Sequence, residues 1–263
     1  MKTLIKLLLL ASVFLLVIFA CKKDQLEIKK TADPCDCASE VSADFDILER
    51  HSFAGGGGAL TTTDNVLSWS TKEVRFRAKQ NDAEYTWYIG ADKEYEREVF
   101  SNFGTEWIGS TIPVTLVVKK KPNLICFPND DGYDSITKTF KIYEMCHEPY
   151  LLEGTFRMAE KNSSDSIDIK IEFKQYAPWN DCLTADITNF DGEGSTCPGN
   201  YFRGSKSYRY FQVSGTPTGS CESIGAFKAW NHLSGICEMK YFYRIDGDPN
   251  KEVNKHIYGR KLN

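Results

Sequence analysis

Cysteine is the residue type with the most specific chemistry in this sequence, and the first of nine cysteines, Cys21, ends an apolar N-terminal run. Two lysines form a basic start, residues 7–20 carry no charge, and the small residue Ala20 comes directly before Cys21. This arrangement predicts a secretory signal peptide over residues 1–20. The apolar run is short for a membrane-spanning helix, which takes about 20 apolar residues.

The segment Ile18-Phe19-Ala20-Cys21 resembles the lipobox of bacterial lipoproteins. The resemblance implies that Cys21 receives acyl chains such as palmitate, becomes the first mature residue and anchors the chain in the outer membrane, facing the periplasm or the cell surface. An ordinary signal peptide with a chance cysteine is the alternative. Residues 21–40 are polar and contain Pro34, which predicts a tether. Within it, Lys22-Lys23-Asp24 resembles the export signal of surface lipoproteins in the Bacteroidetes.

Eight cysteines remain once Cys21 is acylated, and an even number in an exported chain predicts disulfides. They are Cys35, Cys37, Cys126, Cys146, Cys182, Cys197, Cys221 and Cys237. The local pairings are Cys182 with Cys197 and Cys221 with Cys237, while Cys126 and Cys146 pair with each other or with the Cys35–Cys37 segment. Because no repeated C-x-x-C spacing is present, we expect no zinc site.

The usual catalytic motifs are absent from the sequence: it contains no H-E-x-x-H, no G-x-S-x-G and no Walker A run. Its histidines are scattered, at His51, His147, His232 and His256. These observations predict a protein that is not an enzyme and has no cofactor. With 36 acidic residues, a hydrolase with a carboxylate pair in the C-terminal part stays open as an alternative.

The acidic segment 129–134 contains the oxygen ligands that calcium prefers. Its Gly132 comes too early for a D-x-D-x-D-G loop, and Asn, Asp and Gly are also the residues of tight turns. We therefore expect a hairpin turn and no metal.

Three tryptophans are candidate ligand contacts: Trp107, Trp179 and Trp230, the last two followed by Asn180 and Asn231. A Trp beside an amide can stack on a sugar ring while the amide binds its hydroxyls, or it can anchor a protein partner. The alternative is that these rings cover a disulfide or close the end of a barrel.

The sequence pattern predicts that β-strands position these candidate residues. Residues alternate between apolar and polar over 43–48, 74–78, 84–90 and 135–143, and residues 113–118 form an apolar run of strand length, which predicts an all-β fold. The set Val74-x-Phe76-x-Ala78, Tyr85–Gly90 and Pro113–Val118 resembles the PKD (polycystic kidney disease) domain. This resemblance implies an immunoglobulin-like β-sandwich over residues 41–146, with Trp87 in its core and a chain reversal at Gly90.

The boundary of the second domain is expected at His147–Pro149, where the alternation breaks. Short apolar runs recur over residues 147–263 between clusters of turn residues, which predicts an antiparallel β-barrel or β-sandwich. Its opening Leu152–Phe156 and its last strand Tyr258–Leu262 faintly resemble a lipocalin-like barrel.

The charge of the chain bears on its partners. The mature chain has 30 basic and 36 acidic residues, because the signal removes two of the 32 Lys and Arg, and 30 − 36 = −6. A net negative charge argues against nucleic acid.

We therefore expect a non-catalytic outer-membrane lipoprotein, a binding or accessory subunit of an outer-membrane β-barrel complex. A glycan-binding surface lipoprotein, the hydrolase and a lipocalin-like carrier are the alternatives.

Overall fold

The computed structural model describes residues 35, 38–51, 59–68, 72–146, 150–174, 182–197, 204–212, 224–245, 248 and 250–262. The chain divides into two compact units, one of residues 1–39 with 123–128 and one of residues 40–122 with 129–263. The predicted signal peptide, Cys21 and nearly all of the tether lie outside the described residues. Within the described ranges, no helix is long and apolar enough to cross a bilayer.

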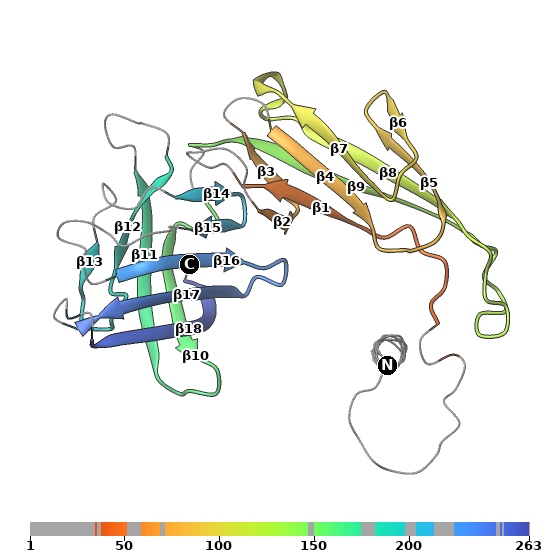
Figure 1. The fold of residues 1–263 in the computed structure, drawn as a ribbon. Coiled ribbons are helices and arrows are strands. Elements are labelled where there is room, and N and C mark those ends of the chain that lie inside the picture. Colours follow the sequence, from red (N-terminus) through yellow and green to blue (C-terminus); the bar gives the residue numbers. More distant parts are fainter. Residues whose placement is uncertain are drawn as a thin grey trace, which may run out of the picture. The chain divides into compact units, whose positions relative to one another are not determined.

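The second unit is built of β-strands, so the predicted all-β class is confirmed (Figure 1). Its N-terminal part holds two sheets. The first has the order β2 (Leu60–Thr63), β1 (Phe45–Arg50), β4 (Lys72–Ala78), β7 (Glu98–Phe103). The second has the order β3 (Asn65–Ser68), β9 (Tyr133–Glu144), β8 (Thr111–Lys119), β5 (Glu84–Ile89), β6 (Asp92–Glu94), and a short 3-10 helix, η1 (Thr105–Trp107), lies between β7 and β8. β3 runs parallel to β9, and the other pairs are antiparallel.

The core of these two sheets follows from the alternation of side chains along each strand. Trp87 is fully buried, its ring packs edge-on to Phe45 at a centroid distance of 5.1 Å, and its Nε1 donates to the Glu96 carbonyl at 2.8 Å. Gly90 has φ of +61° in the two-residue turn between β5 and β6, a conformation that favours glycine. The expectations for Trp87 and Gly90 are thus confirmed.

The C-terminal part is one nine-stranded antiparallel sheet that curls on itself (Figure 1). Its order is β13 (Thr196–Cys197), β12 (Thr184–Thr188), β11 (Ser166–Lys174), β10 (Gly154–Glu160), β18 (Glu252–Lys261), β17 (Cys237–Arg244), β16 (Ile224–Asn231), β15 (Tyr210–Gln212), β14 (Ser205–Ser207). The two end strands are β13 and β14, so the sheet is an open, barrel-like curl. Its core is filled by large side chains, among them Phe156, Phe173, Phe211 and Phe227.

Two disulfides join four of the described cysteines. Cys35 pairs with Cys126, which is one of the pairings left open above, and Cys146 pairs with Cys182. The expected bond between Cys182 and Cys197 is therefore wrong. The cause is the fold: Cys146 follows β9 and Cys182 precedes β12, and their Cα atoms lie 5.5 Å apart although 36 positions separate them.

Cys237 is a free thiol, so its expected place in a disulfide is also wrong. As the first residue of β17 it shares the inward face with Met239 and Tyr241, and it is fully buried in the hydrophobic core. Burial raises the pKa of its thiol to about 12. Cys37 and Cys221 lie outside the described residues, and of Cys197 only the backbone, in β13, is described.

Candidate functional site

The last two residues of β16, Trp230 and Asn231, line a surface groove of about 510 Å³. The other lining residues come from the edge strand β2, from the turn between β14 and β15, and from the turn that follows β16. They are Leu60, Thr61, Thr62, Arg209, His232, Leu233 and Ser234. The sequence-based pairing of Trp230 with Asn231 as a contact site thus lies in a real hollow of the surface.

Trp230 is half-buried, and its ring is held on both sides by neighbouring strands. Cross-strand pairing places Tyr210 of β15 and Glu238 of β17 opposite it. The Trp230 ring lies 5.2 Å from the Tyr210 ring, and the Lys240 ammonium lies 5.4 Å from its centroid. The indole is therefore fixed in place before any ligand binds.

The turn between β16 and β17 supplies the second apolar contact of the groove. His232 N donates to Ile236 O at 2.9 Å, and Gly235 N donates to His232 O at 2.8 Å, which closes a tight turn with Leu233 57% exposed. Leu233 and Thr62 also line a neighbouring hollow of about 350 Å³ that extends to Lys79 and Lys138. The two hollows share these residues and form one extended groove along β2.

Arg209 fixes the wall of the groove. It sits in the two-residue turn between β14 and β15 and forms a two-pronged ion pair with Asp64, with Nε to Oδ1 at 2.7 Å and Nη2 to Oδ2 at 2.6 Å. Its Nη1 donates to the carbonyl oxygens of Asn231 and His232, each at 3.1 Å. Because this guanidinium is only 8% exposed and fully engaged, its role is to position the backbone beside Trp230.

A buried polar cluster lies behind this wall. The Glu49 carboxylate accepts from Tyr208 N at 2.6 Å and from Leu67 N at 2.9 Å, and it pairs with Lys72 at 3.2 Å. Burial raises the pKa of Glu49, while Lys72 and the two amides oppose that shift. With no exposed surface, Glu49 cannot reach a substrate, so the cluster is part of the framework.

His51 completes this framework. Its ring stacks on Tyr210 at a centroid distance of 4.0 Å, and its Nε2 shares a hydrogen bond with the Thr61 hydroxyl. Burial, together with the charge of Lys72, lowers the pKa of His51 to about 4. The ring is therefore neutral at pH 7 and connects β2 to the strand that supports Trp230.

A second charged cluster lies on the sheet beside the groove. Glu238 accepts from His232 at 2.9 Å, from His256 at 2.8 Å and from Lys240 at 2.9 Å. Burial opposes ionisation, but these donors prevail and lower the pKa of Glu238 to about 2. Within the part of the chain that the structure describes, no group of His, Cys, Asp and Glu is placed to hold a metal ion.

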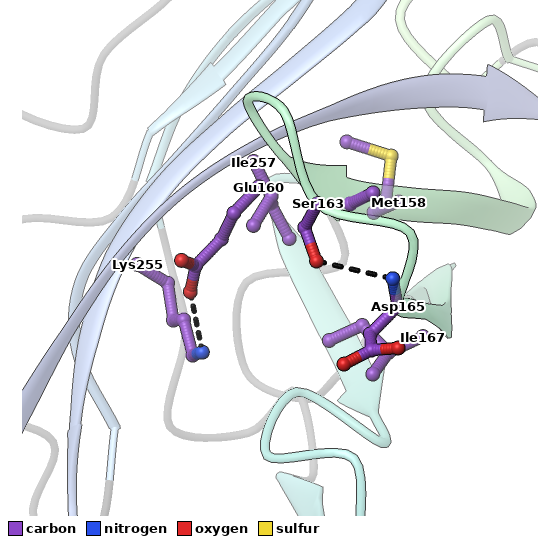
Figure 2. Close-up of a pocket in the computed structure, with 8 residues that line it drawn as sticks. Met158, Glu160, Ser163, Asp165, Ile167, Lys255 and Ile257 are labelled. Atoms are coloured by element: carbon purple, nitrogen blue, oxygen red, sulfur yellow. Dashed lines mark hydrogen bonds and ion pairs between the residues drawn. The ribbon is translucent and has the colours of Figure 1, made fainter.

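Another hollow, of about 230 Å³, is lined by two acidic residues, Glu160 and Asp165, between β10, β11 and β18 (Figure 2). Glu160 pairs with Lys255 at 2.7 Å, and the hydrogen bond from Lys255 lowers the pKa of Glu160. Asp165 N donates to the Ser163 hydroxyl at 3.0 Å on the other side of the hollow (Figure 2). A general acid of a glycosidase needs a raised pKa, so the shift at Glu160 has the wrong direction for that role.

Of the remaining predicted contacts, the structure describes Trp107, which does not line the groove. Trp107 belongs to η1, is 40% exposed and packs edge-on to Phe103 at 5.9 Å. Trp179 and Asn180 lie outside the described residues. In the acidic turn, Asp130 accepts from Gly132 N at 2.9 Å and Asp131 accepts from Tyr133 N at 3.0 Å, as expected of a hairpin turn.

Sequence reasoning missed Arg209, Glu49 and Lys72. The sequence pattern could have indicated two of them. Glu49 follows Phe45 and Ile47 at every second position and so lies on the same face of β1, and Lys72 lies on the same face of β4 as Val74. A charged residue on the inward face of a strand indicates a buried ion pair. No such pattern marks Arg209, which lies in a turn.

No protein-family model matches the chain, and neither does any curated protein or solved structure. The resemblances to lipoproteins, to PKD domains and to lipocalins therefore remain predictions from the sequence.

Proposed function

We propose that this protein is a non-catalytic lipoprotein of the outer membrane, anchored through Cys21, that serves as an accessory subunit of an outer-membrane protein assembly. The observation that carries the proposal is the groove along β2, with Trp230 and Leu233 as apolar contacts. Its volume is in the range of ligand sites, and its wall is held by Arg209 and Asp64. A groove with fixed walls and both polar and apolar lining residues is suited to binding a ligand or a segment of a partner protein.

The strand beside the groove favours an extended protein segment as the ligand. β2 is an end strand of its sheet and pairs only with β1 among the described strands. The backbone groups on the free edge of such a strand can pair with an added strand, while neighbouring pockets take its side chains. Trp230 is a residue type that dominates the binding energy of many protein interfaces.

The test is recovery of the lipidated protein from its native outer membrane in mild detergent, followed by mass spectrometry of its partners. We expect a membrane β-barrel in a stoichiometric amount with the wild type. Trp230→Ala should reduce this recovery by about tenfold or more, as expected for the loss of a central aromatic contact. Phe100→Ser, which changes an exposed aromatic residue of β7 away from the groove, is the matched control. Recovery of the chain alone, or equal recovery with Trp230→Ala, would contradict the proposal.

A glycan is the second candidate ligand, because Trp230 and Asn231 line the groove together with the polar residues Thr61, Thr62 and Ser234. The contacts of the Trp230 ring with Tyr210 and Lys240 limit the face that a sugar could stack on, which is why we rank this ligand second. Glycan-array binding by the wild type that is lost in Trp230→Ala and kept in Phe100→Ser would favour it.

A further inference from the structure

The loop between β8 and β9 presents an apolar tip to solvent. Residues 123–127 form a tight turn in which Phe127 N donates to Asn123 O at 2.8 Å and Cys126 N donates to the same oxygen at 3.1 Å. This turn leaves Leu124 57% exposed and Ile125 86% exposed, the largest exposure among the large apolar side chains that the structure describes. Two adjacent, exposed aliphatic side chains at the tip of a loop are stabilised when an apolar environment removes them from water.

This tip is covalently joined to the segment that precedes the first strand. Cys126, next to Ile125, forms the disulfide with Cys35. Cys35 follows the predicted acylation site by 35 − 21 = 14 positions, a length of chain that spans at most about 50 Å when fully extended. The tip is therefore confined to the neighbourhood of any membrane that holds the acyl chains of Cys21.

Lysines precede both cysteines of the disulfide in the sequence. Lys119, Lys120 and Lys121 come shortly before Asn123, and four lysines with three acidic residues lie between Cys21 and Cys35. Lys120 donates to Asn81 O at 2.7 Å, and Asp130 and Asp131 accept from backbone amides. The charge of these segments is therefore mixed, and the apolar side chains of the tip are the feature that suits the acyl boundary of a bilayer.

We propose that Leu124 and Ile125 insert into the outer-membrane surface as a second contact beside the lipid anchor. The occupant of this surface is the lipid bilayer, and the inference rests on the proposed acylation of Cys21. The Cys35–Cys126 disulfide then acts as a clamp that holds the loop at the membrane. With two points of attachment, the acylated Cys21 and this loop, the protein has fewer orientations available at the membrane surface.

The test places a photo-reactive benzophenone side chain at residue 125 of the full chain in its native outer membrane. Tyr95, which is 63% exposed in the segment between β6 and β7, receives the same group as the matched control. We expect phospholipid adducts on the peptide that contains residue 125 at several times their frequency on the peptide that contains residue 95. Equal frequencies, or cross-links from residue 125 to a protein instead of lipid, would overturn the inference.

The same sample separates this inference from the proposed function. The mass of the peptide that begins with Cys21 reports acylation directly. An acylated Cys21 without lipid adducts at residue 125 overturns the loop contact and leaves the anchor standing, whereas an unmodified Cys21 overturns the anchor on which both rest. The double variant Cys35→Ser/Cys126→Ser should lower the lipid adducts at residue 125 while Cys21 stays acylated, and unchanged adducts would refute the role of the disulfide.

Discussion

Arg209 and Asp64, 145 positions apart in the chain, face each other in a two-pronged ion pair with N–O distances of 2.6 and 2.7 Å. Asp64 lies between β2 and β3, and Arg209 lies between β14 and β15, so the pair connects the N-terminal sheets with the nine-stranded sheet. Because Arg209 also holds the carbonyl groups of Asn231 and His232, this connection and the wall of the groove depend on the same side chain.

Replacing Arg209 by alanine should lower the free energy of unfolding by about 1–3 kcal/mol, because it leaves the carbonyl groups of Asn231 and His232 without their charged donor, while the Asp64 carboxylate is half-exposed and can be solvated. Arg209→Lys should recover only part of this loss, since an ammonium cannot reproduce the two-pronged geometry. Chemical denaturation of the purified variants measures both effects.

A matched control for this prediction is Arg157→Ala. Arg157 forms an equally two-pronged pair with Asp168, at 2.9 Å for each contact, but on the exposed surface. Surface pairs of this kind contribute little to stability, so the midpoint of unfolding should stay unchanged. A loss in Arg157→Ala as large as that in Arg209→Ala would show that burial is not what makes the Arg209 pair matter.

The stability of the protein should fall when the pH is lowered from 7 to 5, through His51. The pKa of His51 is lowered to about 4 by its burial against Tyr210 and Thr61 and by the nearby charge of Lys72, whereas its ordinary value is 6.5. A depressed histidine pKa means that the unfolded chain takes up the proton first, so stability is complete above pH 6.5 and is lost as the pH falls toward 4. For this shift we expect a loss of about 2 kcal/mol between pH 7 and pH 5.

Unfolding by denaturant at several pH values tests this, with His51→Gln as the comparison. Glutamine keeps a polar side chain and cannot titrate, so the variant should lose the pH dependence between 7 and 5 even though it is less stable throughout. Glu238 and Asp44, each with its pKa lowered to about 2, lose their contributions below this window, as the pH falls from their ordinary values toward 2. The raised pKa of Glu49 acts in the opposite direction, adding stability as the pH falls, in both proteins. The assignment to His51 would therefore be contradicted if the wild type and His51→Gln had the same slope of stability against pH between 7 and 5.

Removing the Cys146–Cys182 disulfide should reduce stability by about 2–4 kcal/mol, since it closes a loop between residues 36 positions apart and its loss frees the unfolded chain. The double variant Cys146→Ser/Cys182→Ser avoids leaving one free thiol, and thermal unfolding under non-reducing conditions gives the change. The result that contradicts this prediction is an unfolding temperature equal to that of the wild type.

The long strands of this fold could be predicted from the sequence, and the short ones could not. Strands β8, β9, β11 and β17 carry several periods of apolar alternation, so their existence follows from the pattern. The edge strands β2, β6, β13 and β14 have two to four residues each, too few for a period to appear. Their pairing is imposed by neighbouring strands.

The same limit applies to the groove. Trp230 and Asn231 were predictable as candidate contacts, because a tryptophan beside an amide has recognisable chemistry. The other wall, Leu60 to Thr62, belongs to a strand too short to show an alternating pattern in the sequence. It lies beside Trp230 only because of long-range contacts such as the ion pair of Arg209 with Asp64. The pairing of Cys146 with Cys182 was missed for the same reason, since these cysteines are brought together by the sheets and not by their spacing in the sequence.

Cys237 should be unreactive in the native protein and reactive once the protein unfolds. Its thiol is fully buried at the start of β17, and burial, together with the nearby charge of Glu238, raises its pKa to about 12, so almost no thiolate forms at pH 8. Maleimide labelling without reductant, followed by peptide mass spectrometry, should find the Cys237 peptide unlabelled under native conditions and fully labelled in denaturant. The Cys146 and Cys182 peptides serve as the control, because their disulfide should keep them unlabelled in both conditions. A Cys237 peptide that stays unlabelled in denaturant and appears linked to another cysteine would contradict the free thiol and restore the pairing that the sequence alone suggests.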